Sequence, residues 1–419
     1  MAATETHLAI EAVWKIESAR LIAGLTRIVR DVGVAEELAQ DALVVALEKW
    51  PQSGIPENPG AWLMGTAKHR AIDFFRRGTL IDEKHQVLGR EMAEREMQVP
   101  DLAAAMDDDI GDDMLRLVFI ACHPVLSTEA RVALTLRLLG GLSTDEIARA
   151  YLVSEPTMAQ RIVRAKKTLS DAHAPFEVPR GAEFSARLSS VLQVLYLIFN
   201  EGYSATAGDD WMRPALCEEA LRQGRILAEL VPNEPEVHGL VALMEIQASR
   251  AKARTNASGE PILLLDQDRA KWDRLLIGRG LAALDRAEKL GVARGPYSIQ
   301  AAIAACHARA LTARDTDWPR IAALYEQLAR IEPSPVVELN RAVAVSMAAG
   351  PAAGLELVDA LKDDPALKNY HLLPSVRGDL LKKLGRKDEA REEFERAASI
   401  TRNVRERNLL LDRARACVD

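Results

Sequence analysis

Basic and amide side chains gather in one short stretch of the chain, residues 143–169, at spacings suited to contact with nucleic acid. From Arg149 to Lys167 there are five basic residues and a single acidic one, Glu155. Arginine and glutamine side chains pair with guanine and adenine edges, while lysine and arginine also hold phosphates. These residue types therefore favour binding of duplex DNA.

Two short helices are expected to position these side chains. Ser143 and Glu146 form a capping-box pattern that begins the first helix, and Ser154 caps the second, with Pro156 tolerated in its first turn. One side of the second helix is apolar, at Met158, Ile162, Ala165 and Leu169. The other side presents Thr157, Gln160, Arg161, Arg164 and Lys167. This arrangement is typical of a helix-turn-helix, and a solvated amphipathic helix is the alternative for this segment alone.

A second basic segment, residues 61–77, also has helical periodicity. Its charged side chains are four bases and one acid: Lys68, Arg70, Arg76, Arg77 and Asp73. They can neutralise phosphates while a DNA strand separates. Three aromatic residues of this segment can stack on unpaired bases: Trp62, Phe74 and Phe75. The helical spacing of Trp62 favours a position in the core instead.

A loop and a further helix precede this segment. Residues 51–60 hold three prolines and two glycines and are expected to be a loop. Residues 34–50 predict a helix with an apolar face at Leu38, Ala42 and Val45. A different, mostly polar face carries Glu37, Gln40, Asp41, Val44 and Glu48.

Taken in order, these segments resemble an extracytoplasmic-function (ECF) sigma factor. Residues 143–169 are similar to region 4 of that family, including its closing pattern at Arg164-Ala165-Lys166-Lys167-Thr168-Leu169. Residues 35–43 resemble region 2.2, and residues 61–77 resemble regions 2.3 and 2.4, with His69 where asparagine is common. The resemblance spans residues 10–170.

The resemblance implies partners and roles for named residues. Core RNA polymerase, through its β′ clamp helices, would bind Glu37, Gln40, Asp41, Val44 and Glu48. The −35 element of promoter DNA would bind Ser154, Glu155, Thr157, Gln160, Arg161, Arg164 and Lys167. The −10 element would bind Trp62, Lys68, His69, Arg70, Asp73, Arg76 and Arg77, and the loop 51–60 would capture a flipped base.

Fold class follows from composition and periodicity. Aromatic residues are 5% of the 419 residues, and no segment alternates convincingly like a strand, so we expect an all-α protein. The resemblance divides it into region 2 at residues 1–80, a linker at 81–108, region 4 at 109–172 and a helical extension at 182–419. A helix is expected from about Met114, after an acidic run, and residues 175–181 are expected to be a hinge.

The extension contains a weak repeat. The spacing of a tetratricopeptide (TPR) hairpin occurs at Gly378, Leu381, Gly385, Ala390, Phe394 and Ala397. Tyr325 precedes Phe394 by 69 residues, close to two periods of about 34. We therefore expect a TPR-like solenoid, with an irregular helical domain as the alternative.

In the similar group this extension replaces a separate anti-sigma factor, and three patches look typical of it: residues 199–204, residues 266–269 with Trp272, and residues 295–302. The group also suggests a small YCII-type protein as partner.

Several classes are excluded or disfavoured. The net charge of −7 excludes a globally basic nucleic-acid binder, so a DNA site must be local. The four cysteines, Cys122, Cys217, Cys306 and Cys417, lack zinc-site spacing, so no metal or other cofactor is expected. No nucleophile–base pair or phosphate loop indicates an enzyme, and no signal peptide or apolar run of membrane length is apparent, which favours a cytoplasmic protein. The main alternative is a one-component helix-turn-helix regulator with a TPR-type sensing domain.

Overall fold

The computed structural model describes residues 2–86, 110–291 and 294–418. The chain forms two compact units, residues 1–194 and 195–419. Helices dominate both units, and strands among the described residues are limited to one pair of two residues each. The expected all-α class is therefore confirmed.

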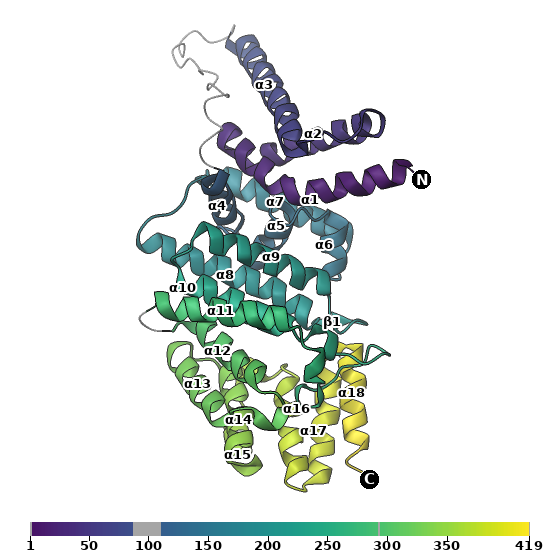
Figure 1. The fold of residues 1–419 in the computed structure, drawn as a ribbon, viewed down its shortest axis with the longest axis vertical. Coiled ribbons are helices and arrows are strands. Elements are labelled where there is room, and N and C mark those ends of the chain that lie inside the picture. Colours follow the sequence, from purple (N-terminus) through teal and green to yellow (C-terminus); the bar gives the residue numbers. More distant parts are fainter. Residues whose placement is uncertain (1, 87–109, 292–293, 419) are drawn as a thin grey trace. The chain divides into compact units, whose positions relative to one another are not determined.

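Among the described residues of the first unit, eight helices begin (Figure 1). Their bounds are α1 (Ala2–Val29), α2 (Val32–Ser53), α3 (Pro59–Gln86), α4 (Ile110–Ala121), α5 (Thr128–Leu138), α6 (Thr144–Ala150), α7 (Glu155–Asp171) and α8 (Ala182–Tyr203). Helices α1, α2 and α3 pack on one another, and α1 also packs on α4. Trp50, Leu63 and Phe119 are among the largest side chains that these contacts bury.

Several expected helix ends differ from the structure. Helix α2 continues through Pro51 to Ser53, so the loop begins at Gly54, where φ is +81°. A proline in the last turn removes only one helical hydrogen bond, which an exposed helix end tolerates. Helix α3 continues to Gln86, beyond the expected linker start at residue 81. Helix α4 starts at Ile110, before the expected start near Met114. The rest of that linker, residues 87–108, lies outside the described residues.

Helix α8 lies across the boundary between the units. Its first half, which we assigned to the extension, packs in the first unit: the buried Arg187 donates to the carbonyl oxygen of Phe119 at 2.9 Å. Phe184 meets the Phe119 ring edge-on, with centroids 5.5 Å apart. By length and mean hydropathy alone α8 could also cross a membrane, but 44% of the relevant window is buried. The core of a soluble protein produces the same signal.

The second unit contains the remaining helices and the strand pair. Their bounds are β1 (Ala207–Gly208), α9 (Pro214–Leu230), α10 (Pro235–Ala248), α11 (Arg274–Leu290), α12 (Pro296–Arg309), α13 (Trp318–Ile331), α14 (Pro335–Ala349), α15 (Pro351–Leu361), α16 (Leu372–Lys383), α17 (Lys387–Ile400), β2 (Arg402–Asn403) and α18 (Val404–Arg415). Short 3-10 turns, η2 to η6, occupy Ala251–Ala253, Leu264–Asp266, Arg269–Lys271, Ala313–Asp315 and Pro365–Leu367. From α9 to α18, each α-helix packs against the next.

The expected hairpin near the C-terminus is present. Gly385, at φ +79°, follows α16 and allows the chain to turn into α17. Gly378 lies against Phe394, because a Cβ at that position would be 2.9 Å from the Phe394 ring. The parallel pair of β1 and β2 joins the two ends of this unit, and the buried Asn403 amide donates to the carbonyls of Ala205 and Asp210.

Replacing Phe394 with alanine tests this packing. The Phe394 ring is fully buried, so Phe394→Ala should lower the free energy of unfolding of the second unit by about 3–5 kcal/mol. Urea denaturation followed by circular dichroism measures the change. Leu411→Ala, at a side chain 39% exposed in α18, is the matched control and should have a much smaller effect. Equal effects of the two variants would contradict this description of the core.

Candidate nucleic-acid interface

Helices α6 and α7 form the expected pair of short helices joined by a tight turn. The Ser143 hydroxyl accepts from the Glu146 amide at 3.1 Å, and the Glu146 carboxylate accepts from the Ser143 amide at 2.8 Å, which confirms the capping box. Burial opposes ionisation of Glu146, but the Ser143 hydrogen bonds and Lys15 outweigh it and lower the pKa of this carboxyl. Leu152, at φ +51°, turns the chain before Ser154 caps α7.

Helix α7 has the two faces that its sequence predicts. Its buried side chains are Met158, Ile162, Ala165 and Leu169. Six of the seven candidate −35 residues are exposed, namely Ser154, Glu155, Thr157, Gln160, Arg164 and Lys167, while Arg161 is half-buried. The pKa of the Glu129 carboxyl is lowered first by hydrogen bonds from its own backbone amide and from Ser127. The nearby charge of Arg161 lowers it further. The solvent face of α7 is thus rich in hydrogen-bond donors and positive charge.

Ser154 has a structural role at the start of α7. The Ser154 hydroxyl lies 2.7 Å from the Thr157 hydroxyl and accepts from the Thr157 amide at 3.4 Å. Ser154 therefore satisfies the first turn of α7, where the helix dipole is positive. This leaves Gln160, Arg164 and Lys167 as long side chains that extend from the exposed face.

The candidate −10 residues lie along α3. His69, Arg70, Asp73 and Arg76 are exposed, Lys68 is half-buried, and the side chain of Arg77 lies outside the described residues. Trp62 instead packs edge-on against the buried Trp50, with ring centroids 5.2 Å apart, which agrees with the expected core position. Phe74 is 45% exposed and meets Phe75 edge-on.

The loop before α3 is short. It spans residues 54–58, and the Asn58 side chain accepts from the Ala61 amide at 3.0 Å, so Asn58 caps α3. The expected loop of residues 51–60 is thus trimmed at both ends by helices. Ile55, 38% exposed, is the most prominent apolar side chain of this loop.

Helix α2 presents a narrow exposed stripe. Glu37, Asp41, Val44 and Glu48 follow one another at helical spacing and are all exposed, with Val44 51% exposed. Gln40, the fifth candidate for polymerase binding, is half-buried and donates to Glu36 Oε1 at 2.6 Å. The structure therefore brings four of the five candidates together on one surface, which we call the α2 stripe.

A buried carboxylate joins α2 to the helix-turn-helix. Glu36 is 2% exposed and accepts from Arg137 Nε of α5 at 2.5 Å. Its other oxygen forms an ion pair with Lys166 of α7. We call Glu36, Arg137 and Lys166 the Glu36 junction. It explains why Lys166, although part of the basic pattern in the sequence, does not belong to the exposed face of α7.

Further contacts hold α1 against the same helices. Asp113 of α4 is 4% exposed and pairs with Arg27 at 3.2 Å and Arg116 at 2.7 Å. Gly141, at φ +65°, approaches α1 so closely that a Cβ there would lie 2.9 Å from the Ser18 hydroxyl. The two segments that the sequence links to DNA, α3 and α7, therefore belong to one unit, in which both pack on α2.

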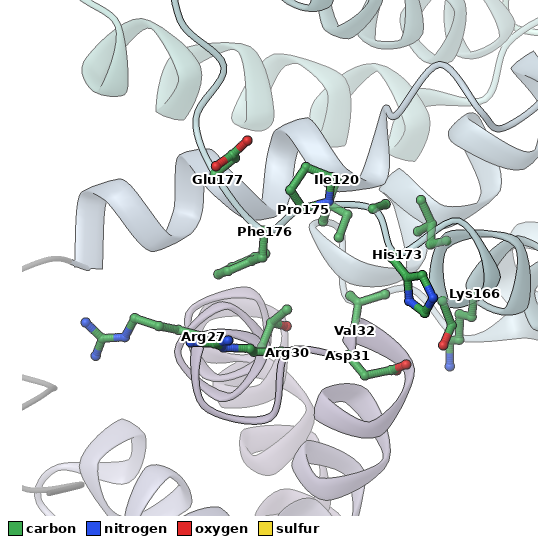
Figure 2. Close-up of a pocket in the computed structure, with 14 residues that line it drawn as sticks. Arg27, Arg30, Asp31, Val32, Ile120, Lys166, His173, Pro175, Phe176 and Glu177 are labelled. Carbon is green, nitrogen blue, oxygen red and sulfur yellow. The ribbon is translucent and has the colours of Figure 1, made fainter. Parts of the chain in front are cut away.

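A cleft of about 500 Å³ opens beside the Glu36 junction. Figure 2 shows Asp31, His173 and Lys166 on one side of this cleft and Arg27 on the other. Phe176, from the segment that follows α7, lies between them. This cleft and the junction were missed from the sequence because their residues are far apart in the chain. One local indication of the junction exists in the sequence: the acidic Glu36 lies on the same face of α2 as the apolar Ala35 and Ala39.

The four cysteines, Cys122, Cys217, Cys306 and Cys417, are free thiols. Burial raises the pKa of Cys122 to about 11 and that of Cys217 to about 12, so both thiols are protonated at neutral pH. Among the described residues, no group of three or more histidine, cysteine, aspartate or glutamate side chains could hold a metal ion.

Comparison with known proteins assigns three segments to families. Residues 17–80 match Sigma-70 region 2, residues 116–169 match Sigma-70, region 4, and residues 187–288 match a family of unknown function, DUF6596. An uncharacterized protein of Rhizobium meliloti (strain 1021) is 44% identical over 385 residues, which cover 91% of this chain and 89% of that protein. No solved structure matches. The first two matches contain the exposed faces of α3 and α7.

The Glu36 junction predicts a stability difference between adjacent residues. Glu36→Gln removes the carboxylate but keeps the shape, and leaves the charges of Arg137 and Lys166, 21% and 19% exposed, without their partner. The free energy of unfolding of the first unit should fall by about 3 kcal/mol, the cost typical of one missing partner. Urea denaturation followed by tryptophan fluorescence measures it.

Glu37→Gln is the matched control, since Glu37 is exposed on the same helix and should change stability by less than about 0.5 kcal/mol. If both variants unfold at the same urea concentration, the junction does not hold these helices together.

Proposed function

The chain belongs to the sigma-70 family, as an ECF-type sigma factor with a C-terminal extension, and from this we propose that it binds core RNA polymerase, directs it to specific promoters and assists −10 melting. In this proposal the protein is not an enzyme, and it works in the cytoplasm, where the polymerase is. Region 2 and region 4 matches in one chain support a role in transcription initiation; the finer roles rest on the surfaces described above.

The observation that carries the proposal is the α2 stripe. A repressor that only binds duplex DNA has no use for an exposed line of acidic residues interrupted by Val44, because acids repel phosphates. A protein partner can use it: an apolar centre between charges is typical of protein–protein contacts. In our proposal this partner is the pair of β′ clamp helices of core polymerase, which Glu37, Asp41, Val44 and Glu48 contact.

The α7 face recognises the −35 element in this proposal. A recognition helix enters the major groove with its first turns near base edges. Gln160 and Arg161 are within two turns of the N-terminus of α7, whereas Arg164 and Lys167 lie further along and are suited to phosphates. Ser154, Glu155 and Thr157 would lie at the groove entrance.

The α3 face and the loop at 54–58 act on the −10 element. Arg70 and Arg76 are exposed bases that can hold the phosphates of a separating strand, with His69 and Asp73 beside them. The loop supports capture of a flipped base, whose extrusion costs a few kcal/mol that a shaped site offsets. Lys68 and Arg77 would add charge, and Trp62 acts through its packing on Trp50.

Engaging both promoter elements requires the Glu36 junction to open. The elements are about 25 base pairs apart, roughly 85 Å along a duplex with 3.4 Å per step. Helix α7 has 17 residues and is therefore about 25 Å long, and the junction ties it to α2. We propose that the closed first unit is a resting form and that polymerase binding, under control of the extension, separates regions 2 and 4.

Arg161 tests the −35 assignment. Arg161→Ala should weaken binding of the reconstituted polymerase complex to duplex from the region upstream of the protein's own gene by about 1–3 kcal/mol. Fluorescence anisotropy measures the affinity. Arg20→Ala, at an exposed arginine of α1, is the control and should leave affinity unchanged. Unchanged affinity in both variants would remove Arg161 from the interface.

Run-off transcription tests the whole proposal. The full chain with core polymerase should produce specific transcripts from that upstream region. Arg70→Ala should lower the yield on duplex templates, and a template with an artificially opened −10 bubble should restore it, because the variant loses strand separation and keeps −35 binding. Failure of the bubble to restore transcription would contradict a melting role. The absence of any transcript, with duplex still bound, would instead favour a one-component regulator.

A further inference from the structure

A cavity of about 430 Å³ lies within the second unit. Its walls come from α8, α10, α12, α13 and α14, so helices from several parts of the array contribute to it. Small-molecule sites in proteins occupy clefts of about 300–1,000 Å³ that combine apolar walls with a few polar groups. The size of this cavity fits that class.

Aromatic rings form much of the wall. Phe199 and Tyr203 of α8 are stacked with centroids 5.7 Å apart, and Tyr196 of the same helix meets Tyr297 edge-on. The Tyr196 hydroxyl donates to Gln300 Oε1 at 3.1 Å, and Tyr325 of α13 also lines the cavity. Burial raises the pKa of Tyr325 to about 12, so its hydroxyl remains a donor at neutral pH. Such a wall suits a planar apolar body.

One cation in the wall lacks a counter-charge. Arg250 donates to the Tyr203 hydroxyl, and its guanidinium lies 5.6 Å and 5.7 Å from the ring centroids of Tyr203 and Trp272. Among the described residues, no carboxylate forms an ion pair with Arg250, and its buried Nε has no hydrogen-bond partner. Arginine with free donors and aromatic flanks is the residue that proteins use to hold carboxylates.

Two more arginines, Arg254 and Arg269, lie near Arg250 and add positive charge around it. Burial lowers their pKa values, and repulsion from the charge of Arg250 lowers them further. His307, which is 7% exposed, has a pKa lowered to about 4 by burial and by Arg250 and Arg269, so it is neutral at pH 7. The acid that lines the cavity, Glu332, is exposed to solvent. The inner part of the cavity therefore favours an anion.

Two further polar atoms are buried without partners: Gln247 Oε1 and His307 Nδ1. A buried polar atom without a hydrogen bond costs about 1–3 kcal/mol, so several on one cavity wall need an explanation. Two more polar side chains, Asn200 of α8 and Gln300 of α12, line this cavity, and Arg269 and Trp272 contact its lining residues His307 and Arg250. Polar groups distant in sequence are thus gathered at one place.

We propose that this cavity binds a small organic carboxylate with a planar apolar body. The carboxylate lies against Arg250, and the ring packs between Tyr203, Phe199 and Tyr325. Hydrogen bonds with Gln247 and Gln300 orient it. This site goes beyond the proposed function and does not depend on it, since binding is measured on the chain alone.

Isothermal titration calorimetry on the full chain tests the proposal. The probes are benzoate, 2-naphthoate and indole-3-acetate, each compared with the corresponding neutral amide. At least one carboxylate should bind with one-to-one stoichiometry and about tenfold or more tighter than its amide, the ratio expected for one charge-assisted contact. Equal affinities of acid and amide, or no binding of any of the three acids, would overturn the proposal.

Gln247→Glu separates loss of binding from loss of fold. It puts a carboxylate three residues before Arg250, where it can occupy the guanidinium, so carboxylate binding should fall by about tenfold or more while the melting temperature is kept. Gln327→Glu, at an exposed residue of α13, adds the same charge on the surface and should leave binding unchanged. A folded Gln247→Glu protein that still binds the carboxylate as tightly as the original chain would also overturn the proposal.

Discussion

A buried carboxylate between two cations determines how the first unit presents its surfaces. A carboxylate at 2% exposure is costly to bury without partners of opposite charge, and Arg137 and Lys166 supply them to Glu36, so α2, α5 and α7 meet at this point. Successive residues of a helix are 100° apart, so the face of α2 that carries Glu36 and Gln40 differs from the one that carries Glu37 and Val44. Once the junction forms, the α2 stripe is left to solvent.

The same interaction divides the basic residues of α7. Lys166 is withdrawn into the junction, and Gln160, Arg164 and Lys167 are left on the exposed face. A basic run in a sequence does not reveal this division, because charge alone does not say which lysine has a buried partner. One charge thus holds the helices together, and the others lie on the exposed face that our proposal assigns to promoter DNA.

Local patterns in the sequence predicted much of the fold. The capping box at Ser143, the buried stripe of α7 and the hairpin around Phe394 depend on residues a few positions apart, and all three are present. Contacts between distant residues were not predictable. Arg187 binds Phe119 from 68 positions away, so the extension could not be separated from the first unit at residue 182 by composition. The end of α2 was wrongly predicted at Pro51 for a different reason. A proline ends a helix only where the loss of its hydrogen bond matters, and this one lies in the last turn.

Association with core RNA polymerase tests the account most directly. Binding of the full chain to core polymerase, titrated by fluorescence anisotropy, should saturate at one-to-one stoichiometry. Val44→Asp should weaken it by about tenfold or more, because the apolar centre of the α2 stripe becomes charged. Ile16→Asp, at an α1 side chain 64% exposed, should leave it unchanged. No association between the chain and core polymerase, or equal loss in both variants, would contradict the account.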